Sequence, residues 1–218
     1  MKKLIFLSIL LVGMTSFCLN AQLFVGGNIG LNTSGGKTDN DGEVDKGTKT
    51  LGVDINPMFG YYLNENMAAG FKLILSMDRT VTPPYFEDGD ETIYTVSSFG
   101  LAPFLRYHFI RFGKFSVFGQ GQLSVVFGSG KTKIGDNTNE DPKVTSIGIS
   151  VFPGLSFDIS DNFSLETSLN AFGLGYSISQ TNNENTNIKT TNSSGYLGLN
   201  LDNIKTLGSI TVGAIYRF

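Results

Sequence analysis

The sequence contains a single histidine, His108, which is the first candidate for a catalytic residue. An imidazole can act as general base for a serine nucleophile, as in an outer-membrane enzyme that hydrolyses lipid. Ser98, Ser116 and Ser124 fall on segments that we expect to form neighbouring strands, but no sequence feature orients them towards His108. A lone histidine near the end of a strand is more often a polar filler, so we predict no catalytic residue.

A metal site is not expected either, because one histidine cannot build a histidine-based metal cluster. Two acidic segments, DNDGEVD at 39–45 and EDGDE at 87–91, have the residue types that bind calcium. The first of them lacks the ligand spacing and the distant glutamate of an EF-hand loop. Solvated surface loops account for both segments, and we predict neither a metal nor another cofactor.

The N-terminal segment predicts export. MKKLIFLSILLVGMTSFCLNAQ has two lysines, then an apolar stretch, then Ala21 before Gln22, which is the order found in a cleavable signal peptide. We therefore divide the chain into a signal, 1–21, and one domain, 22–218. The alternative, an N-terminal membrane anchor, is disfavoured because the apolar run is short for a bilayer. The only cysteine, Cys18, would leave with the signal, so the mature domain would contain no disulfide.

The charge balance argues against a nucleic-acid partner. The formal net charge is −3, and it becomes more negative when Lys2 and Lys3 leave with the signal. Nucleic-acid binding would require a clustered basic face instead. After residue 21 no apolar run approaches the roughly 18 residues of a membrane helix, so any membrane crossing must be made by strands.

Alternation of apolar and polar residues dominates the rest of the chain and predicts an all-β fold. We expect eight strands, near 22–34, 49–63, 67–78, 93–109, 115–128, 144–159, 163–178 and 205–218. Short turns at 64–66, 110–114 and 160–162 alternate with long polar loops at 35–48, 79–92, 129–143 and 179–204. This rhythm is typical of an outer-membrane barrel with its turns in the periplasm. The prediction is a single eight-stranded antiparallel up-and-down transmembrane β-barrel. The strand-like piece 196–201 either extends the eighth strand past an irregularity or lies across the loop mouth.

Alternation alone also fits a soluble sandwich or lipocalin, whose apolar face points inward. Strand length, the rhythm of the connections and the aromatic residues favour the membrane barrel. The aromatics gather beside the short turns and the C-terminus, which predicts a girdle at one membrane boundary formed by Tyr61, Tyr62, Tyr107, Phe109, Phe112, Phe115, Phe157, Phe163, Tyr216 and Phe218.

With lipid on the apolar face, the polar face lines a narrow interior. The side chains expected there are Asn28, Asp54, Asn56, Lys72, Arg106, His108, Gln120, Gln122, Glu166, Asn170 and Arg217. Eight strands leave an interior just wide enough for side chains, and buried charges must be paired. We predict that the cations Lys72, Arg106 and Arg217 pair with Asp54 and Glu166 in a network that fills the interior. A small pore lined by these charges is the alternative.

Four segments together resemble the outer membrane protein β-barrel domain family, which is similar in architecture to small OmpA/OmpX-type barrels. They are the signal-like start, the opening strand LFVGGNIGLNTS, the central SFGLAPFLRYHF and the final GAIYRF. The resemblance covers the whole mature chain. It implies contact with outer-membrane lipid and insertion by the barrel assembly machinery, for which it suggests Phe218, with Tyr216, as the recognised terminal signal. Members of the family often have no known molecular function, so the resemblance implies a location rather than a chemistry.

The expected function is therefore structural or interactive. The chain would be an exported integral outer-membrane protein, not an enzyme, whose long loops 35–48, 79–92, 129–143 and 179–204 meet an unknown extracellular partner. A narrow channel, or a transporter or binder of small molecules, is the alternative. An outer-membrane enzyme that modifies lipid is the third hypothesis.

Overall fold

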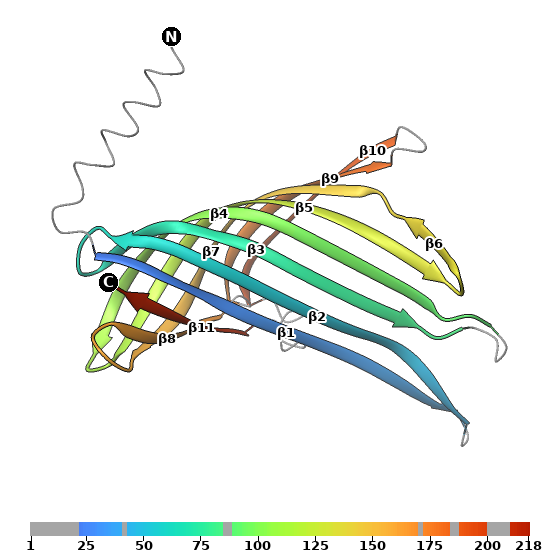
Figure 1. Cartoon of the computed structure of the whole chain (residues 1–218), viewed down its shortest axis with the longest axis horizontal. Coiled ribbons are helices and arrows are strands. Elements are labelled where there is room, and N and C mark those ends of the chain that lie inside the picture. Colours follow the sequence, from blue (N-terminus) through green and yellow to red (C-terminus); the bar gives the residue numbers. More distant parts are fainter. Residues whose placement is uncertain (1–21, 41–42, 85–88, 170–171, 184–187, 200–209) are drawn as a thin grey trace, which may run out of the picture.

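The computed structural model describes residues 22–40, 43–84, 89–169, 172–183, 188–199 and 210–218, and the described elements are β-strands (Figure 1). They are β1 (Gln22–Asn40), β2 (Glu43–Tyr62), β3 (Met67–Thr82), β4 (Thr92–Phe112), β5 (Phe115–Ile134), β6 (Asn137–Glu140), β7 (Lys143–Asp158), β8 (Phe163–Leu169), β9 (Phe172–Asn183), β10 (Ile188–Leu199) and β11 (Ile210–Arg217). Within these ranges no helix is long and apolar enough to span a bilayer. The signal predicted at 1–21 lies outside the described residues.

The strands close into a ring at the end of the molecule that carries the short turns. β1 to β5 pair in chain order, β5 pairs with β7, β7 with β8, and β8 with β11. β11 then pairs antiparallel with β1, from Phe24↔Arg217 to Ile29↔Val212, and this pairing closes an eight-stranded ring. The start of β1 and the C-terminus therefore lie side by side (Figure 1). The predicted all-β, eight-stranded antiparallel barrel is confirmed.

The outer surface of the barrel is apolar, which separates the membrane barrel from the soluble alternative. On β3, the outward side chains Phe71, Leu73, Leu75 and Met77 are 40–52% exposed, whereas the inward Ala68 is buried. The same contrast holds on β4, where Leu105 is exposed and Arg106 is buried. A soluble barrel would reverse these faces. Such a surface is suited to lipid on the outside and to polar packing within.

The predicted strand 163–178 is wrong in one respect, because two strands, β8 and β9, stand in its place along β7. The pairing moves from Gly154↔Ser168 to Val151↔Leu174, so the β8–β9 side carries three extra residues. An odd offset exchanges the inward and outward faces. An unbroken strand would have turned Leu174 and Ile178 into the interior and Ser177 towards lipid, and the offset reverses both placements. The expected interior residue Asn170 lies outside the described residues.

The predicted loop 179–204 is also partly wrong, because β10 forms within it. β10 pairs with β9 from Ile188↔Asn183 to Leu199↔Phe172, just as β11 pairs with β8. β10 and β11 thus pair with β9 and β8 in turn, and the strand-like piece that begins at Tyr196 belongs to β10 up to Leu199, which favours an extension of the eighth strand over a segment across the loop mouth. Residues 200–209, with the predicted start of the last strand at 205, lie outside the described residues.

The other predicted loops are shorter than expected, because the hairpins continue as paired strands. β1 and β2 pair as far as Asn40↔Glu43, so most of 35–48 is strand. β3 runs to Thr82, β5 runs to Ile134, and β6 adds a short pair with β5. Threonines recur in these extensions, and threonine is a β-branched residue that favours the pleated conformation. The long hairpins project from the end opposite the turns (Figure 1).

Candidate functional site: the barrel interior

A buried ion pair crosses the interior. Arg106 on β4 donates from Nη1 to both carboxylate oxygens of Glu166 on β8, at 2.7 and 2.8 Å. β5 and β7 lie between these two strands, so the contact spans the lumen rather than joining neighbours. Arg106 is 2% exposed and Glu166 is 7% exposed. Their burial is tolerable because each charge compensates the other and makes further contacts.

Polar and aromatic neighbours complete the surroundings of the Arg106 guanidinium. Gln120 Oε1 accepts from Nε at 3.1 Å and from Nη2 at 2.8 Å. The Phe118 ring centroid lies 4.1 Å from Cζ, and that of Phe104 lies 5.7 Å away. A guanidinium that stacks on aromatic rings while bonding a carboxylate is held in one position. These contacts fix Arg106 in the middle of the lumen.

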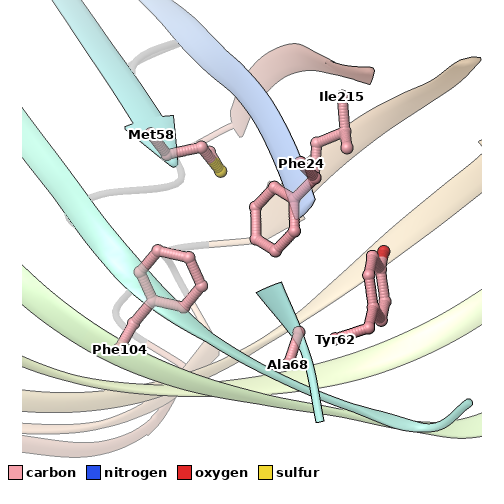
Figure 2. Close-up of a cluster of buried hydrophobic side chains, with 6 residues drawn as sticks. All are labelled: Phe24, Met58, Tyr62, Ala68, Phe104 and Ile215. Atoms are coloured by element: carbon pink, nitrogen blue, oxygen red, sulfur yellow. The ribbon is translucent and has the colours of Figure 1, made fainter. Parts of the chain in front are cut away.

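An apolar cluster fills the interior towards the turn end, and the sequence reasoning missed it. Figure 2 shows its side chains converging from β1, β2, β3, β4 and β11; they are Phe24, Met58, Tyr62, Ala68, Phe104 and Ile215. Tyr62, expected in the outer girdle, instead points inward and is 8% exposed. The alternation could have revealed this, because Tyr62 shares its face of β2 with the inward Asn56 and Met58.

Glycines on neighbouring strands make room for the inward rings. A side chain at Gly60 would bring its Cβ to 2.6 Å from Phe24 Cζ, and one at Gly70 would meet Phe104 Cζ at 2.8 Å. A Cβ at Gly154 would overlap the Phe118 ring. Phenylalanine rings therefore pack against glycines of the next strand, a cross-strand arrangement known to stabilise glycine in sheets.

Arg217 forms a second ion pair, near the turn end. Its Nη2 donates to Asp158 Oδ1 at 2.9 Å, and Ser164 donates to the same carboxylate oxygen at 2.5 Å. Tyr62 lies beneath the guanidinium, with its ring centroid 5.5 Å from Cζ. The predicted network paired Arg217 with Asp54 or Glu166. This part of the prediction is wrong, because Arg217 pairs with Asp158. Asp158 lies on the polar face of β7, so the alternation of 144–159 could have placed it in the interior as a possible partner for Arg217.

Lys72 and Asp54 occupy the same interior without a direct ion pair between them. Lys72 Nζ lies over the Phe152 ring, 5.8 Å from its centroid, and interacts electrostatically with Asp54 on the next strand. Other expected interior residues bond to one another: Asn56 donates to Asn28 at 2.9 Å and Gln120 to Gln122 at 3.3 Å. The interior thus contains the expected residue types, with pairings that the sequence did not specify.

His108 meets one of the three serines considered for it. Its Nδ1 lies 3.1 Å from Ser116 Oγ, and its Nε2 has no hydrogen-bond partner among the described residues. The ring is buried between Tyr62 and Phe118, whose centroids are 6.2 and 5.5 Å away. A lipid has no access to this pair. In the described ranges no cluster of three or more metal-binding side chains occurs, and the acidic segments 39–45 and 87–91 lie partly outside those ranges.

The half of the interior towards the long hairpins is lined by small side chains and is hollow. One cavity of about 170 Å³ is bordered by Tyr94, Val96, Ser98 and Ser146. A second, of about 190 Å³, is bordered by Ser124, Ser150 and Ser177. The bulky arginine and aromatic side chains described above all lie nearer the turn end. The lumen is therefore filled at one end and roomy at the other.

The C-terminus is tied into the sheet. Phe218 N donates to Leu23 O at 2.9 Å, and Arg217 N donates to Asn162 O at 2.7 Å. The rings of Tyr216 and Phe218 point outward, with centroids 5.1 Å apart, and Phe218 is 69% exposed. Other outward aromatics of the predicted girdle lie near the same end and are also exposed: Tyr107, Phe109, Phe112 and Phe115. Ordered terminal aromatics on the outer face suit a membrane boundary.

Comparisons with known proteins agree with this architecture. The family model described as "Outer membrane protein beta-barrel domain" matches residues 19–179. None of the curated proteins matches the chain by sequence. Among solved structures, the Neisserial surface protein A is similar at 15% identity, over 91% of this chain and 99% of that one, with a TM-score of 0.40.

Two further solved structures are similar over most of their length. The attachment invasion locus protein Ail of Yersinia pestis is 16% identical over 91% of this chain and 98% of that one, with a TM-score of 0.37. The outer membrane protein OprG of Pseudomonas aeruginosa is 12% identical over 91% of this chain and 95% of that one, with a TM-score of 0.45. Similarities this distant carry no information about a ligand or partner.

Proposed function

Because the chain belongs to the outer membrane protein β-barrel domain family, we propose that it is a non-conducting outer-membrane barrel with a structural or surface-interaction role. Its interior is closed by side chains, its short turns lie in the periplasm, and its long hairpins project outside the cell. The proposed orientation rests on the general asymmetry of such barrels, in which turns are periplasmic and long connections extracellular.

The Arg106–Glu166 pair is the main observation that supports a closed interior. It joins opposite sides of the lumen at 2.7 Å, and Gln120 and Phe118 occupy the space around it. The buried apolar cluster adds further side chains to the interior towards the turn end. An eight-stranded barrel is narrow enough for such side chains to fill it. A structural role follows, because a filled lumen stabilises the wall and conducts nothing.

Planar-bilayer recording tests this proposal. The purified protein should give no steady current, whereas a variant that opens both obstructions, Arg106→Ala and Glu166→Ala in the ion pair with Phe104→Ala in the apolar cluster, should give small openings. Lys114→Gln, at an exposed turn position, is the control and should remain silent. A steady single-channel current from the unmodified protein would refute the closed interior and favour the channel hypothesis.

A binder of small molecules is the second candidate, supported by the hollows among serine and valine side chains near the hairpins. A hollow of this size accepts a molecule about as large as benzene, so the ligand would be small. Equilibrium dialysis with labelled short-chain alcohols and short-chain carboxylic acids tests it. Gly128 lines the first hollow, so the larger side chain of Gly128→Leu should fill it and abolish any binding that this cavity supports.

Two interactions belong to the same proposal. The hairpins that project beyond the barrel offer exposed polar surface to an extracellular partner, and Phe218 with Tyr216 serves the barrel assembly machinery as the terminal signal. We assign no enzymatic step. The His108–Ser116 pair is buried behind Tyr62 and Phe118, which supports a role in packing rather than catalysis.

A further inference from the structure

The outward apolar surface ends in basic residues at its border towards the hairpins. On β2 the outward side chains Phe59, Ile55 and Leu51 are followed by Lys49. On β3 the outward run that ends at Met77 is followed by Arg79. On β5 the run that ends at Phe127 is followed, after one serine, by Lys131 and then Lys133. Lys49, Arg79, Lys131 and Lys133 are all exposed, and we call these four residues the basic rim.

Strand register places the basic rim on two adjacent rows of the outer surface. One row runs Leu51↔Arg79↔Thr95↔Lys131, and the next runs Lys49↔Val81↔Ile93↔Lys133. Neighbouring strands are about 4.8 Å apart, so the backbones at Arg79 and Lys131 lie about 10 Å apart. Residues far apart in the sequence therefore present their charge to one area of the surface.

The position of the basic rim matches a membrane boundary. At ~3.3 Å per residue and a tilt of about 40°, the stretch from Lys49 to the outward Tyr61 rises about 30 Å along the membrane normal. The hydrocarbon core of a bilayer has about this thickness. When the aromatic end lies at one boundary, Lys49 and Arg79 lie at the other, at the depth of the lipid head groups.

The neighbouring groups suit a phosphorylated amphiphile. A hollow of about 740 Å³ adjoins Lys49 and Arg79, and hydroxyl and apolar side chains such as Thr33 and Leu51 help to line it. Glu91 also lines it, and Glu140 stands opposite Lys131 in the register, so the rim is not purely basic. Neither Lys49 nor Arg79 forms an ion pair within the described residues. As far as the described residues extend, these two cations are available beside the apolar surface.

We propose that the basic rim, chiefly through Lys49 and Arg79, binds the phosphate groups of the outer-leaflet glycolipid, of the lipid A class. The inference rests on the orientation given above, which brings the rim to the outer leaflet. Arginine and lysine are the principal protein ligands of phosphate, and clusters of them at a membrane surface attract anionic head groups. The exposed Leu51 and Met77 below the rim contact the acyl chains of the same lipid.

Lipid titration of the purified barrel in neutral-lipid nanodiscs tests the proposal. The probes are bisphosphorylated lipid A, dephosphorylated lipid A and phosphatidylglycerol. The unmodified protein should bind bisphosphorylated lipid A best. Each removed charge should weaken binding about fivefold, so Lys49→Gln with Arg79→Gln should weaken it about 25-fold. Lys114→Gln, a matched loss of charge at the turn end, should change nothing.

Three results would overturn the inference. The first is that the double variant and the unmodified protein bind bisphosphorylated lipid A equally. The second is that the unmodified protein binds phosphorylated and dephosphorylated lipid A equally. The third is that it binds phosphatidylglycerol as tightly as bisphosphorylated lipid A. The last would indicate a general anionic-lipid surface instead of a glycolipid site. Each variant must show heat-modifiable migration on gels, so that loss of folding is not mistaken for loss of binding.

A labelling experiment separates this inference from the proposed orientation. The only cysteine lies at position 18, in the predicted signal, so Asp136→Cys at the β5–β6 turn would give a mature chain with a single thiol. Modification by a membrane-impermeant maleimide in intact cells supports the orientation. If Asp136→Cys is labelled and the lipid titration shows no preference, the lipid site alone is wrong. If a folded Asp136→Cys protein is not labelled, the orientation is wrong.

Discussion

Arg106 and Glu166 face each other across the barrel, from strands that do not touch, and are joined by two hydrogen bonds of 2.7 and 2.8 Å. Removing the carboxylate with Glu166→Ala leaves the arginine buried without a counter-charge. We expect this change to lower the free energy of unfolding by about 3–5 kcal/mol. Urea unfolding in lipid vesicles, followed by gel migration, measures the shift. Glu65→Gln, at an exposed turn, is the control, and an unchanged midpoint for Glu166→Ala would refute the role of the pair.

Gly154 gives a test of interior packing that involves no charge. Gly154→Ala places a methyl group where the Phe118 ring lies, and we expect a loss of about 1–3 kcal/mol. Gly121→Ala is the matched control, because its Cβ would meet nothing closer than Val151 Cγ2 at 3.8 Å. Adding Phe118→Leu to Gly154→Ala should recover part of the loss, since the two positions are coupled. Strictly additive effects would show that the ring and the glycine are independent.

The terminal aromatic is a test of assembly. Phe218→Asp, or a polar tail added after Phe218, should reduce the amount of barrel in the outer membrane, because the terminal signal and the pairing with Leu23 are both disturbed. Heat-modifiable protein in the membrane fraction is the measurement. Phe112→Asp changes another exposed aromatic of the same end and serves as control. Normal insertion of the Phe218 variants would remove this role.

The His108–Ser116 pair gives a prediction about lipid chemistry. Ser116→Ala removes the hydroxyl that contacts His108 but leaves the surrounding rings in place. Cells carrying this variant should have the same lipid composition by mass spectrometry as cells carrying the unmodified protein. A change in acyl-chain content, with the barrel amount equal, would instead support the hydrolase hypothesis.

Alternation predicted the strands and their two faces, because side-chain direction has a period of two in every strand. Strand length and the rhythm of short and long connections then favoured the membrane barrel. Arg106 and Glu166 could be assigned to the interior in this way, but alternation carries no information on which interior charges meet. Arg217 has Asp158 as its partner because strand tilt and register bring them together, and both are long-range properties. The inward cluster around Phe24 and Tyr62 was missed for a different reason, because Tyr62 was assigned to the outer girdle from its place beside a turn although alternation puts it on the inward face.

The offset between β8 and β9 is the main feature of the fold that strand-by-strand reasoning did not predict. It moves the pairing by three residues between Gly154↔Ser168 and Val151↔Leu174. Its trace in the sequence is a change of phase, since Leu165 and Leu174 are both outward although one number is odd and the other even. A phase change within a predicted strand is therefore better interpreted as a break in the pairing than as noise in the alternation.

The uneven filling of the interior has a consequence for motion. Large side chains fill the lumen and contact one another at the turn end, whereas small side chains and hollows occupy the lumen near the hairpins. Regions with few buried contacts open locally at low free-energy cost. Amide hydrogen exchange should therefore be slow around Phe24 and Phe104 and progressively faster towards the hairpins. The turn end of the barrel would thus be rigid, whereas the hairpin end would be flexible and could adapt its shape to a partner outside the cell.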